Sequence, residues 1–258
     1  MRNHYRIGLI VPSSNVTMET ELPEMFRRRA TVAPETFTVH SSRVRMRNVT
    51  PQELAQMAHD GDRCVAELAD AHVDVMAYAC LVAIMCQGAG HHERTEDHLA
   101  DMAAAQGCPA PVVTSAGALV RGVRALGVTR VALVAPYLRP LTDLVVQYLR
   151  DAGIETVRSV SLEIADNLQV AALEPLRLPG IARSLDLDGV EAVVLSACVQ
   201  MPSLAAIDRA ESLLERPVLS ASVATAYDIL DRLGLEAVVP GAGTLLSGRL
   251  PARQDRVP

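Results

Sequence analysis

The chain has 258 residues, half of them hydrophobic, which suffices for one large domain or two small ones with a sizeable core. Its net charge of −6 argues against nucleic acid as the main partner, because such binding needs clustered basic residues. No uncharged apolar run reaches the roughly 18–20 residues of a transmembrane helix, so we expect no membrane partner. A signal-peptide pattern is missing, and five cysteines, an odd number, do not suggest a disulfide framework. We therefore expect a cytoplasmic protein with reduced cysteines.

Short apolar runs and helical patterns alternate through the first half of the chain. Thr50, Pro51 and Glu53 form a strong helix-start pattern, with Thr as the N-cap and Glu three residues later. Ser115 is expected to cap a later helix that Gly127 ends. The predicted strands cover residues 6–11, 37–44, 73–79 and 111–113. One helix is predicted after residue 15, and three more at about 51–71, 94–106 and 116–126.

The second half repeats this scheme in the same order. Asp166 and Asn167 fall in a predicted loop, and Ser220 is expected to cap the last helix. The predicted strands cover residues 130–135, 154–160, 191–197 and 217–219. Helices are predicted at about 139–152, at about 173–186, from about 203 onward and at about 221–233.

The two halves also share sequence motifs. RIGLIVPSSN at 6–15 matches RVALVAPYLRP at 130–140, 124 positions later. Alternating strands and helices with short connections imply parallel sheets covered on both faces. We predict an α/β fold of two similar Rossmann-like domains, related by a pseudo-twofold, with the active site in the cleft between them. The predicted division is 1–114 plus 221–258 for the first half and 115–220 for the second, because the helices at 116–126 and 221–233 occupy equivalent places.

A cysteine ends a matched strand in each half. VDVMAYAC at 73–80 and VEAVVLSAC at 190–198 place Cys80 and Cys198 118 positions apart. A lone cysteine in such a protein is most often a buried structural residue, but duplication at equivalent strand ends favours a function. A probable helix follows each cysteine, and a helix start can lower a cysteine pKa. We therefore expect the two thiols to face one another across a shared cleft.

A facing thiol pair supports two kinds of chemistry. One thiolate can remove an α-proton while the other thiol returns a proton on the opposite face, which gives racemisation without a cofactor. Alternatively, one thiolate can add to an electron-poor alkene while the other thiol protonates the neighbouring carbon. The second route makes a freely rotating single bond, and its reversal after rotation gives cis–trans isomerisation.

Other chemistry-bearing residues are interpreted as structural. Cys64, Cys86 and Cys108 have no counterpart in the other half. The run from His91 to His98 is rich in His and acidic residues, but it lacks the usual histidine spacing of a metal site, so we expect a solvated helix start. No Gly-rich fingerprint for a nucleotide cofactor occurs.

Three motifs carry a resemblance to a known family. The opening RIGLIVPSSNVTMETE, the YACLVA around Cys80 and the SACVQMPS around Cys198 resemble maleate cis–trans isomerase, of the aspartate/glutamate racemase superfamily. The match spans nearly the whole chain. It implies a homodimeric, cofactor-independent enzyme that converts maleate to fumarate through a succinyl-cysteine intermediate.

The resemblance also implies roles for individual residues. Cys80 falls on the nucleophile of the family and Cys198 on its general acid, which protonates the adjacent carbon. Taken alone, Asn15 suggests a helix cap and Asn167 a turn residue. The resemblance places substrate contacts on the side chains of Asn15, Tyr137 and Asn167 and on backbone groups of Leu81, Val82 and Val199. No arginine occurs in these motifs, so neutral donors must hold the small dicarboxylate.

Two other functions remain open at this point. A two-cysteine amino-acid racemase of the aspartate/glutamate type would use the same thiols, but no acidic residue stands beside either cysteine to bind an ammonium group. Arylmalonate decarboxylase, a further relative, keeps only one cysteine of the pair. From a different class, a non-catalytic dicarboxylate-binding module would bind its ligand without turnover and without needing the thiols.

Overall fold

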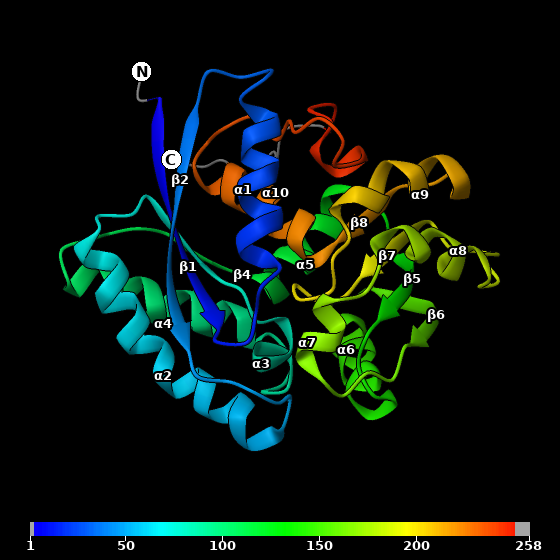
Figure 1. Cartoon of the computed structure of the whole chain (residues 1–258), viewed down its shortest axis with the longest axis horizontal. Helices are drawn as coiled ribbons and strands as arrows, with labels where there is room; N and C mark the ends of the chain where they lie inside the picture. The colour runs from blue at the N-terminus through cyan, green and yellow to red at the C-terminus, as the bar shows by residue number, and fades with distance from the viewer. Residues whose placement is uncertain (1–2, 251–258) are drawn as a thin grey trace.

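Each half of the chain builds a four-stranded parallel sheet in the computed structural model, which describes residues 3–250 (Figure 1). The first sheet has the order β2-β1-β3-β4 and the second the equivalent order β6-β5-β7-β8. The strands are β1 (His4–Pro12), β2 (Thr36–Val44), β3 (Val75–Tyr78), β4 (Val112–Thr114), β5 (Arg130–Ala135), β6 (Glu155–Ser161), β7 (Ala192–Ser196) and β8 (Val218–Ser220). The predicted fold class is confirmed, and each predicted strand lies within two residues of an observed one at both ends.

Helices connect the strands and cover both faces of each sheet (Figure 1). They are α1 (Met18–Arg29), α2 (Pro51–Asp70), α3 (Leu81–Met85), α4 (His91–Ala105), α5 (Ser115–Ala125), α6 (Arg139–Asp151), α7 (Asn167–Ala171), α8 (Leu178–Arg183), α9 (Ile207–Leu214) and α10 (Ala221–Arg232). Three single-turn 3₁₀ helices complete the described chain: η1 (Pro175–Arg177), η2 (Leu204–Ala206) and η3 (Thr244–Leu246).

Burial along the strands explains the near-continuous apolar runs of the sequence. The inner strands β3 and β7 are buried at every residue, because helices cover both faces of the sheet. β2 and β6 lie at sheet edges and are partly exposed. In β1 the exposed residues lie at the amino end and the carboxyl end is fully buried. The buried carboxyl ends therefore point into the molecule, where the loops of the two halves meet.

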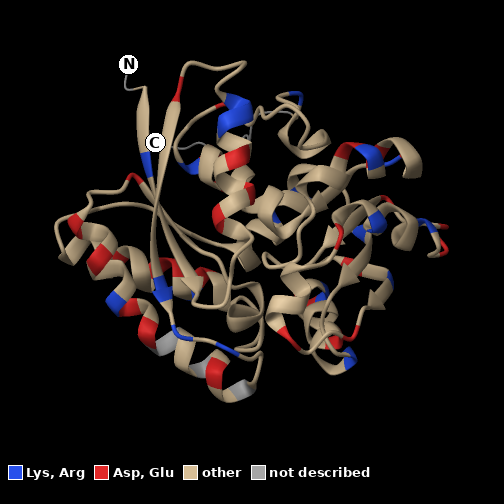
Figure 2. Cartoon of the chain, in the orientation of Figure 1, with Lys and Arg blue, Asp and Glu red and all other residues tan. Residues whose placement is uncertain are grey.

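Charge is distributed in keeping with this arrangement. Acidic and basic residues gather on the outer helices α2, α4, α8 and α9, whereas the inner strands carry few of them (Figure 2). In the part of the chain that the structure describes, no helix combines the length and the apolar character that a bilayer crossing requires.

Two helix assignments differ from the sequence-based predictions. Thr114, and not Ser115, caps α5: its hydroxyl accepts the Gly117 N–H at 3.0 Å, because the helix begins one residue earlier than predicted. The predicted helix 173–186 is divided into η1 and α8, each with a proline in its first turn. A proline lacks the N–H that would continue a helix and restricts the residue before it, so the segment cannot form one regular helix.

The last helix links the two sheets. α10 packs against α5 and α1 and also contacts β3, β4 and β8. Within this packing, the Arg121 guanidinium lies between the carboxylates of Glu96 and Asp228, with N–O distances of 2.6 Å to both. All three side chains are nearly inaccessible to solvent. The division of the chain at residues 114 and 220 stays a prediction.

Candidate active site

Cys80 and Cys198 occupy equivalent places at the ends of β3 and β7. One alanine separates each strand from its cysteine, and each alanine extends the sheet by one hydrogen bond. The Ala79 N–H donates to the Ile10 carbonyl at 2.8 Å, and the Ala197 N–H donates to the Val134 carbonyl at 2.9 Å. Cys80 and Cys198 are 4% and 5% exposed. The duplicated sheets therefore deliver two buried thiols to the region where the halves meet.

Tyr137 lies beside the Cys198 thiol. It follows β5, is 6% exposed, and its hydroxyl is hydrogen-bonded to Cys198. Burial raises the pKa of Tyr137 well above its ordinary value, and negative charge on either cysteine raises it further. Since the hydroxyl keeps its proton, it acts as a donor toward Cys198.

Burial dominates the protonation of both cysteines. Desolvation raises the pKa of Cys80 to about 12, against the opposing effect of a hydrogen bond from the Ala83 N–H. Burial also raises the pKa of Cys198, although the Tyr137 hydroxyl and the backbone N–H groups of Gln200 and Met201 favour its thiolate. The expectation that a helix start lowers the pKa is wrong for the free protein, because the loss of water outweighs the few donors present.

Asn15 lies in the loop after β1 and is 1% exposed. Its side-chain oxygen accepts the N–H groups of Thr17 and Met18 at 3.1 and 2.9 Å, so it does cap the start of α1. Its side-chain nitrogen donates to the Val199 carbonyl in the other half, at 3.4 Å. Asn15 is therefore both a helix cap and a contact beside Cys198.

Asn167 is the first residue of α7, which Asp166 caps, and so does not lie in the predicted loop. Its side-chain nitrogen donates to the Ser14 hydroxyl at 2.7 Å, across the junction of the two halves. Asn167 and Tyr137 also line a pocket of about 180 Å³, whose other wall residues are apolar: Val49, Leu138, Pro140, Leu141, Ile164, Ala165 and Val170. Two of the predicted binding side chains thus face one hollow.

The predicted backbone contacts lie directly after the cysteines. Leu81 and Val82 open α3, and the first N–H groups of a helix have no acceptor within it. Val199 follows Cys198 and is buried. The loop of Val199 is held by the Ser196 hydroxyl, which donates to the carbonyls of Cys198 and Met201 at 2.8 and 3.2 Å.

Two buried residues at the site were not predicted. Gln200, which is 2% exposed, contacts the loops of both halves through its side-chain amide. Glu21 of α1 accepts the N–H groups of Ser203 and Leu204, each at 2.6 Å. In the sequence Glu21 looks like an ordinary acidic residue of a helix start, and its partners lie about 180 positions away.

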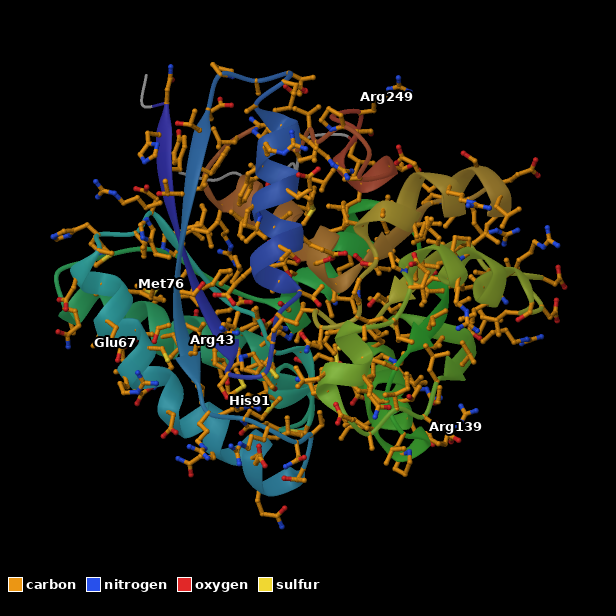
Figure 3. All side chains as sticks on the ribbon, in the orientation of Figure 1. Arg43, Glu67, Met76, His91, Arg139 and Arg249 are labelled. Carbon is orange, nitrogen blue, oxygen red and sulfur yellow. The ribbon has the colours of Figure 1, made fainter. Side chains whose placement is uncertain are left out.

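An arginine lies beside the first-half loop. Arg43, at the end of β2, donates a hydrogen bond to the Asn15 carbonyl and pairs with Glu19 at 3.1 Å (Figure 3). It contacts the backbone of the loop and not the Asn15 side chain. Arg43 therefore supports the loop from its outer side.

The histidine-rich start of α4 differs from its prediction. His92 is buried, and its Nδ1 lies 2.5 Å from the Tyr148 hydroxyl, so it joins α4 to α6 instead of facing solvent. Among the side chains that the structure describes, no group of three or more His, Cys, Asp or Glu could hold a metal ion. Cys64 and Cys108 are buried and Cys86 is half-buried.

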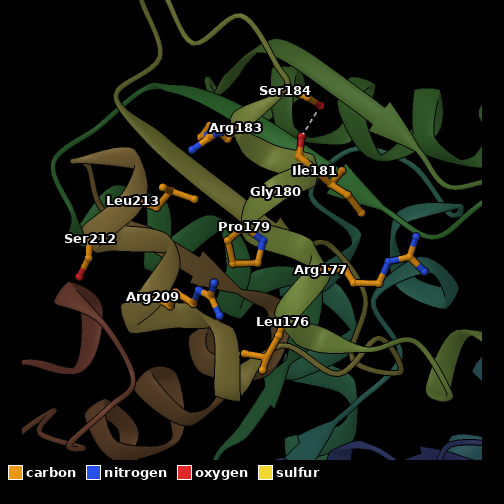
Figure 4. Close-up of a pocket in the computed structure, with 10 residues that line it drawn as sticks. All are labelled: Leu176, Arg177, Pro179, Gly180, Ile181, Arg183, Ser184, Arg209, Ser212 and Leu213. Atoms are coloured by element: carbon orange, nitrogen blue, oxygen red, sulfur yellow. Dashed lines mark hydrogen bonds between the residues drawn. The ribbon is translucent and has the colours of Figure 1, made fainter.

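A separate surface groove of about 900 Å³ lies between α8 and α9 (Figure 4). It contains none of the predicted site residues. Its wall is formed by Leu176, Arg177, Pro179, Gly180, Ile181, Arg183, Ser184, Arg209, Ser212 and Leu213.

Known proteins resemble this chain over almost its whole length. Residues 7–246 match the family model of arylmalonate decarboxylase. The maleate isomerase of Geobacillus stearothermophilus is 56% identical over 250 residues, which are 96% of this chain and 100% of that protein. The maleate isomerase Iso of Pseudomonas putida S16, solved as a cysteine-to-alanine variant with maleate, is 55% identical with a TM-score of 0.94, over 96% of this chain and 99% of that one.

A further solved structure shows a reaction intermediate. A cysteine-to-serine variant of the Nocardia farcinica maleate cis–trans isomerase carries a covalently bound succinylcysteine. It is 49% identical to this chain, with a TM-score of 0.91, and the likeness covers 95% of this chain and 98% of that one.

Proposed function

The chain belongs to the arylmalonate decarboxylase family and, within it, to the maleate isomerases, and on this premise we propose that it converts maleate to fumarate without a cofactor. The observation that carries the proposal is the pair of buried cysteines at equivalent strand ends, with the Tyr137 hydroxyl as a donor to Cys198. The substrate is a small dicarboxylate, and the enzyme is a cis–trans isomerase.

Cys80 acts as the nucleophile and Cys198 as the general acid. The Cys80 thiolate adds to one alkene carbon of maleate, and the C=C π pair becomes a carbanion on the neighbouring carbon. Cys198 gives its proton to that carbon, which leaves a succinyl group on Cys80 and a thiolate at Cys198. After rotation about the new single bond, Cys198 removes a proton, the bond to Cys80 breaks, and fumarate leaves.

This cycle needs one proton shared by the two thiols. At the moment of attack, Cys80 must be the thiolate and Cys198 the thiol. Both pKa values are raised in the free protein. One proton must therefore leave the pair before the first addition, and the fraction of enzyme in the reactive form increases with pH.

Neutral donors hold the carboxylates in the proposed site. The side chains of Asn15, Tyr137 and Asn167 and the backbone groups of Leu81, Val82 and Val199 serve as the contacts. The buried positions of Asn15 and Asn167, one from each half, support this assignment. A neutral amide can follow the turning carboxylate at lower cost than a bidentate arginine, whose geometry is fixed.

Two assignments on the cellular form of the enzyme accompany the function. We propose that it works as a homodimer and in the cytoplasm. The dimer follows from the resemblance to the isomerase family, and the location from the sequence pattern. Light scattering coupled to size-exclusion chromatography tests the dimer, which a mass of about one chain would contradict.

The test of the function is incubation with maleate alone, followed by NMR. We expect fumarate to accumulate and an intact-mass increase of one succinyl group on Cys80. Exchange of an aspartate or glutamate α-proton in deuterated water, without fumarate, would favour the racemase. Maleate binding without turnover, retained in Cys80→Ser and Cys198→Ser, would favour the non-catalytic module.

A further inference from the structure

We propose that Gln200 is a positioning residue that holds the Asn15 loop, the start of α7 at Asn167 and the Cys198 thiol in their reactive arrangement. This inference rests on the proposed isomerase function and assigns a role within the same site. Gln200 lies two residues after Cys198 in the SACVQMPS motif. It is 2% exposed.

The side-chain amide of Gln200 contacts three backbone groups in two loops. Its nitrogen donates to the Ser14 carbonyl and to the Asn167 carbonyl, both at 2.9 Å. Its oxygen accepts the Val16 N–H at 3.0 Å. Ser14 and Val16 flank Asn15 on both sides, and Asn167 is itself a proposed binding residue. The Gln200 amide therefore bridges the segments of Asn15 and Asn167, in addition to the direct hydrogen bond from Asn167 to the Ser14 hydroxyl.

The backbone of Gln200 adds two contacts on the side of the thiol. Its N–H points to the Cys198 sulfur, with an N–S distance of 3.4 Å, and stabilises the thiolate. Its carbonyl accepts the Thr17 hydroxyl at 2.7 Å, which links it to the start of α1. Side chain and backbone together join the general acid to both binding loops.

The donor pattern requires a glutamine at this place. A glutamate of the same length keeps the acceptor for Val16 but places a carboxylate oxygen against the carbonyls of Ser14 and Asn167. A methionine fills a similar volume but offers neither donor nor acceptor, so the backbone groups of Ser14, Val16 and Asn167 lose this partner. Either change allows the two loops to move apart while the sheets below remain in place.

This arrangement predicts a specific kinetic effect. Misplacing binding groups by about 1 Å costs on the order of 100-fold in rate constant. Gln200→Met is therefore expected to lower kcat/KM for maleate by about 100-fold, mainly through a higher KM, because the side chain acts on the binding loops. A loss of folded protein alone would lower the apparent kcat and leave KM unchanged.

The experiment compares steady-state kinetics of the parent, Gln200→Met and Gln200→Glu, with Gln147→Met as the matched control. Gln147 lies on the exposed face of α6, where its amide pairs with Asp151. Circular dichroism and a melting curve establish the folded fraction of each variant. Gln200→Glu supplies a second test, because its carboxyl can donate one hydrogen bond only when protonated. Its kcat/KM relative to the parent should therefore rise as the pH is lowered.

The outcomes separate this inference from the function on which it rests. A parent enzyme that does not convert maleate would contradict the proposed function. With an active parent, an unchanged KM in Gln200→Met together with a pH-independent ratio for Gln200→Glu would overturn the positioning role. A raised KM in folded Gln200→Met, with Gln147→Met equal to the parent, would support it.

Discussion

The two cysteine loops have the same backbone origin and different surroundings. In both halves an alanine extends the strand before the cysteine. After Cys80 the helix α3 begins at once, and the thiol has the Ala83 N–H as a donor. After Cys198 the chain passes through a turn before η2, and the thiol has three donors, from the Tyr137 hydroxyl and from the backbone of Gln200 and Met201.

This difference teaches how a duplicated site becomes asymmetric. Sheet geometry gives both thiols the same burial, and burial raises both pKa values. The additional donors at Cys198 favour negative charge there, and that charge in turn raises the pKa of Cys80. The two sheets therefore supply equivalent buried thiols, and the segments after them supply unequal sets of donors.

Replacing each cysteine in turn tests the asymmetry most strongly. Cys80→Ala is expected to lower turnover by more than about 10⁴-fold, because no adduct can form. Cys198→Ala is expected to lower it by about 10²–10⁴-fold, the usual contribution of a general acid. Cys108→Ala, a buried cysteine outside the site, is the control. Intact mass measures the adduct, and a succinyl group on Cys198 in the Cys80→Ala protein would reverse the roles.

The pH dependence of Cys80 alkylation tests the raised pKa of this thiol. A pKa of about 12 leaves roughly one Cys80 in 10⁴ ionised at pH 8. Alkylation of Cys80 by iodoacetamide should therefore accelerate about tenfold per pH unit between pH 7 and 10. Because the reactive form has lost one proton, kcat/KM should also rise with pH until one proton has left the pair. Peptide mass spectrometry follows the alkylation, and a rate that is constant above pH 7 would contradict the raised pKa.

Tyr137→Phe removes a donor from only one of the two thiols. Without the hydroxyl, the pKa of Cys198 rises further, and a proposed substrate contact is lost. We expect kcat/KM to fall by about 10–100-fold and the rise of activity with pH to move to higher pH. A pH–rate profile measures both effects. Tyr5→Phe, on the outer part of β1, serves as the control. An unshifted pH–rate profile in Tyr137→Phe would show that the Tyr137 hydroxyl does not influence the pKa of Cys198.

Replacing Glu21 tests whether this side chain of the first half stabilises the segment that follows Cys198 in the second half. Its carboxylate accepts the N–H groups of Ser203 and Leu204, and Glu21→Ala leaves these buried donors without a partner. We expect the free energy of unfolding to fall by about 2–4 kcal/mol. Urea unfolding measures the loss. Glu24→Ala, on a more exposed part of α1, should change stability little, and equal stability of both variants would show that Glu21 does not hold the loop.

Local patterns in the sequence were enough for the fold and for the position of the two cysteines at equivalent strand ends. Alternation of buried runs and helical segments predicted all eight strands, and duplication placed Cys80 and Cys198 at equivalent ends. The first feature depends on neighbours within one element and the second on a repeat of similar segments, so both are visible in a single sequence. Helix breaks are harder to predict: two prolines divide the segment 173–186 into η1 and α8.

The tertiary structure decided what surrounds the thiols. Gln200 meets Ser14 from 186 positions away, and Glu21 meets Ser203 from 182 positions away. Such contacts leave no periodic pattern in the sequence, because they depend on how two independently formed sheets face each other. The pKa values of the two cysteines likewise depend on the tertiary structure. Helix starts suggested a lowered pKa for the cysteines, but the burial that raises it exists only in the packed structure. The sequence therefore determined where the thiols lie along the chain, and the packing determined the direction of their pKa shifts.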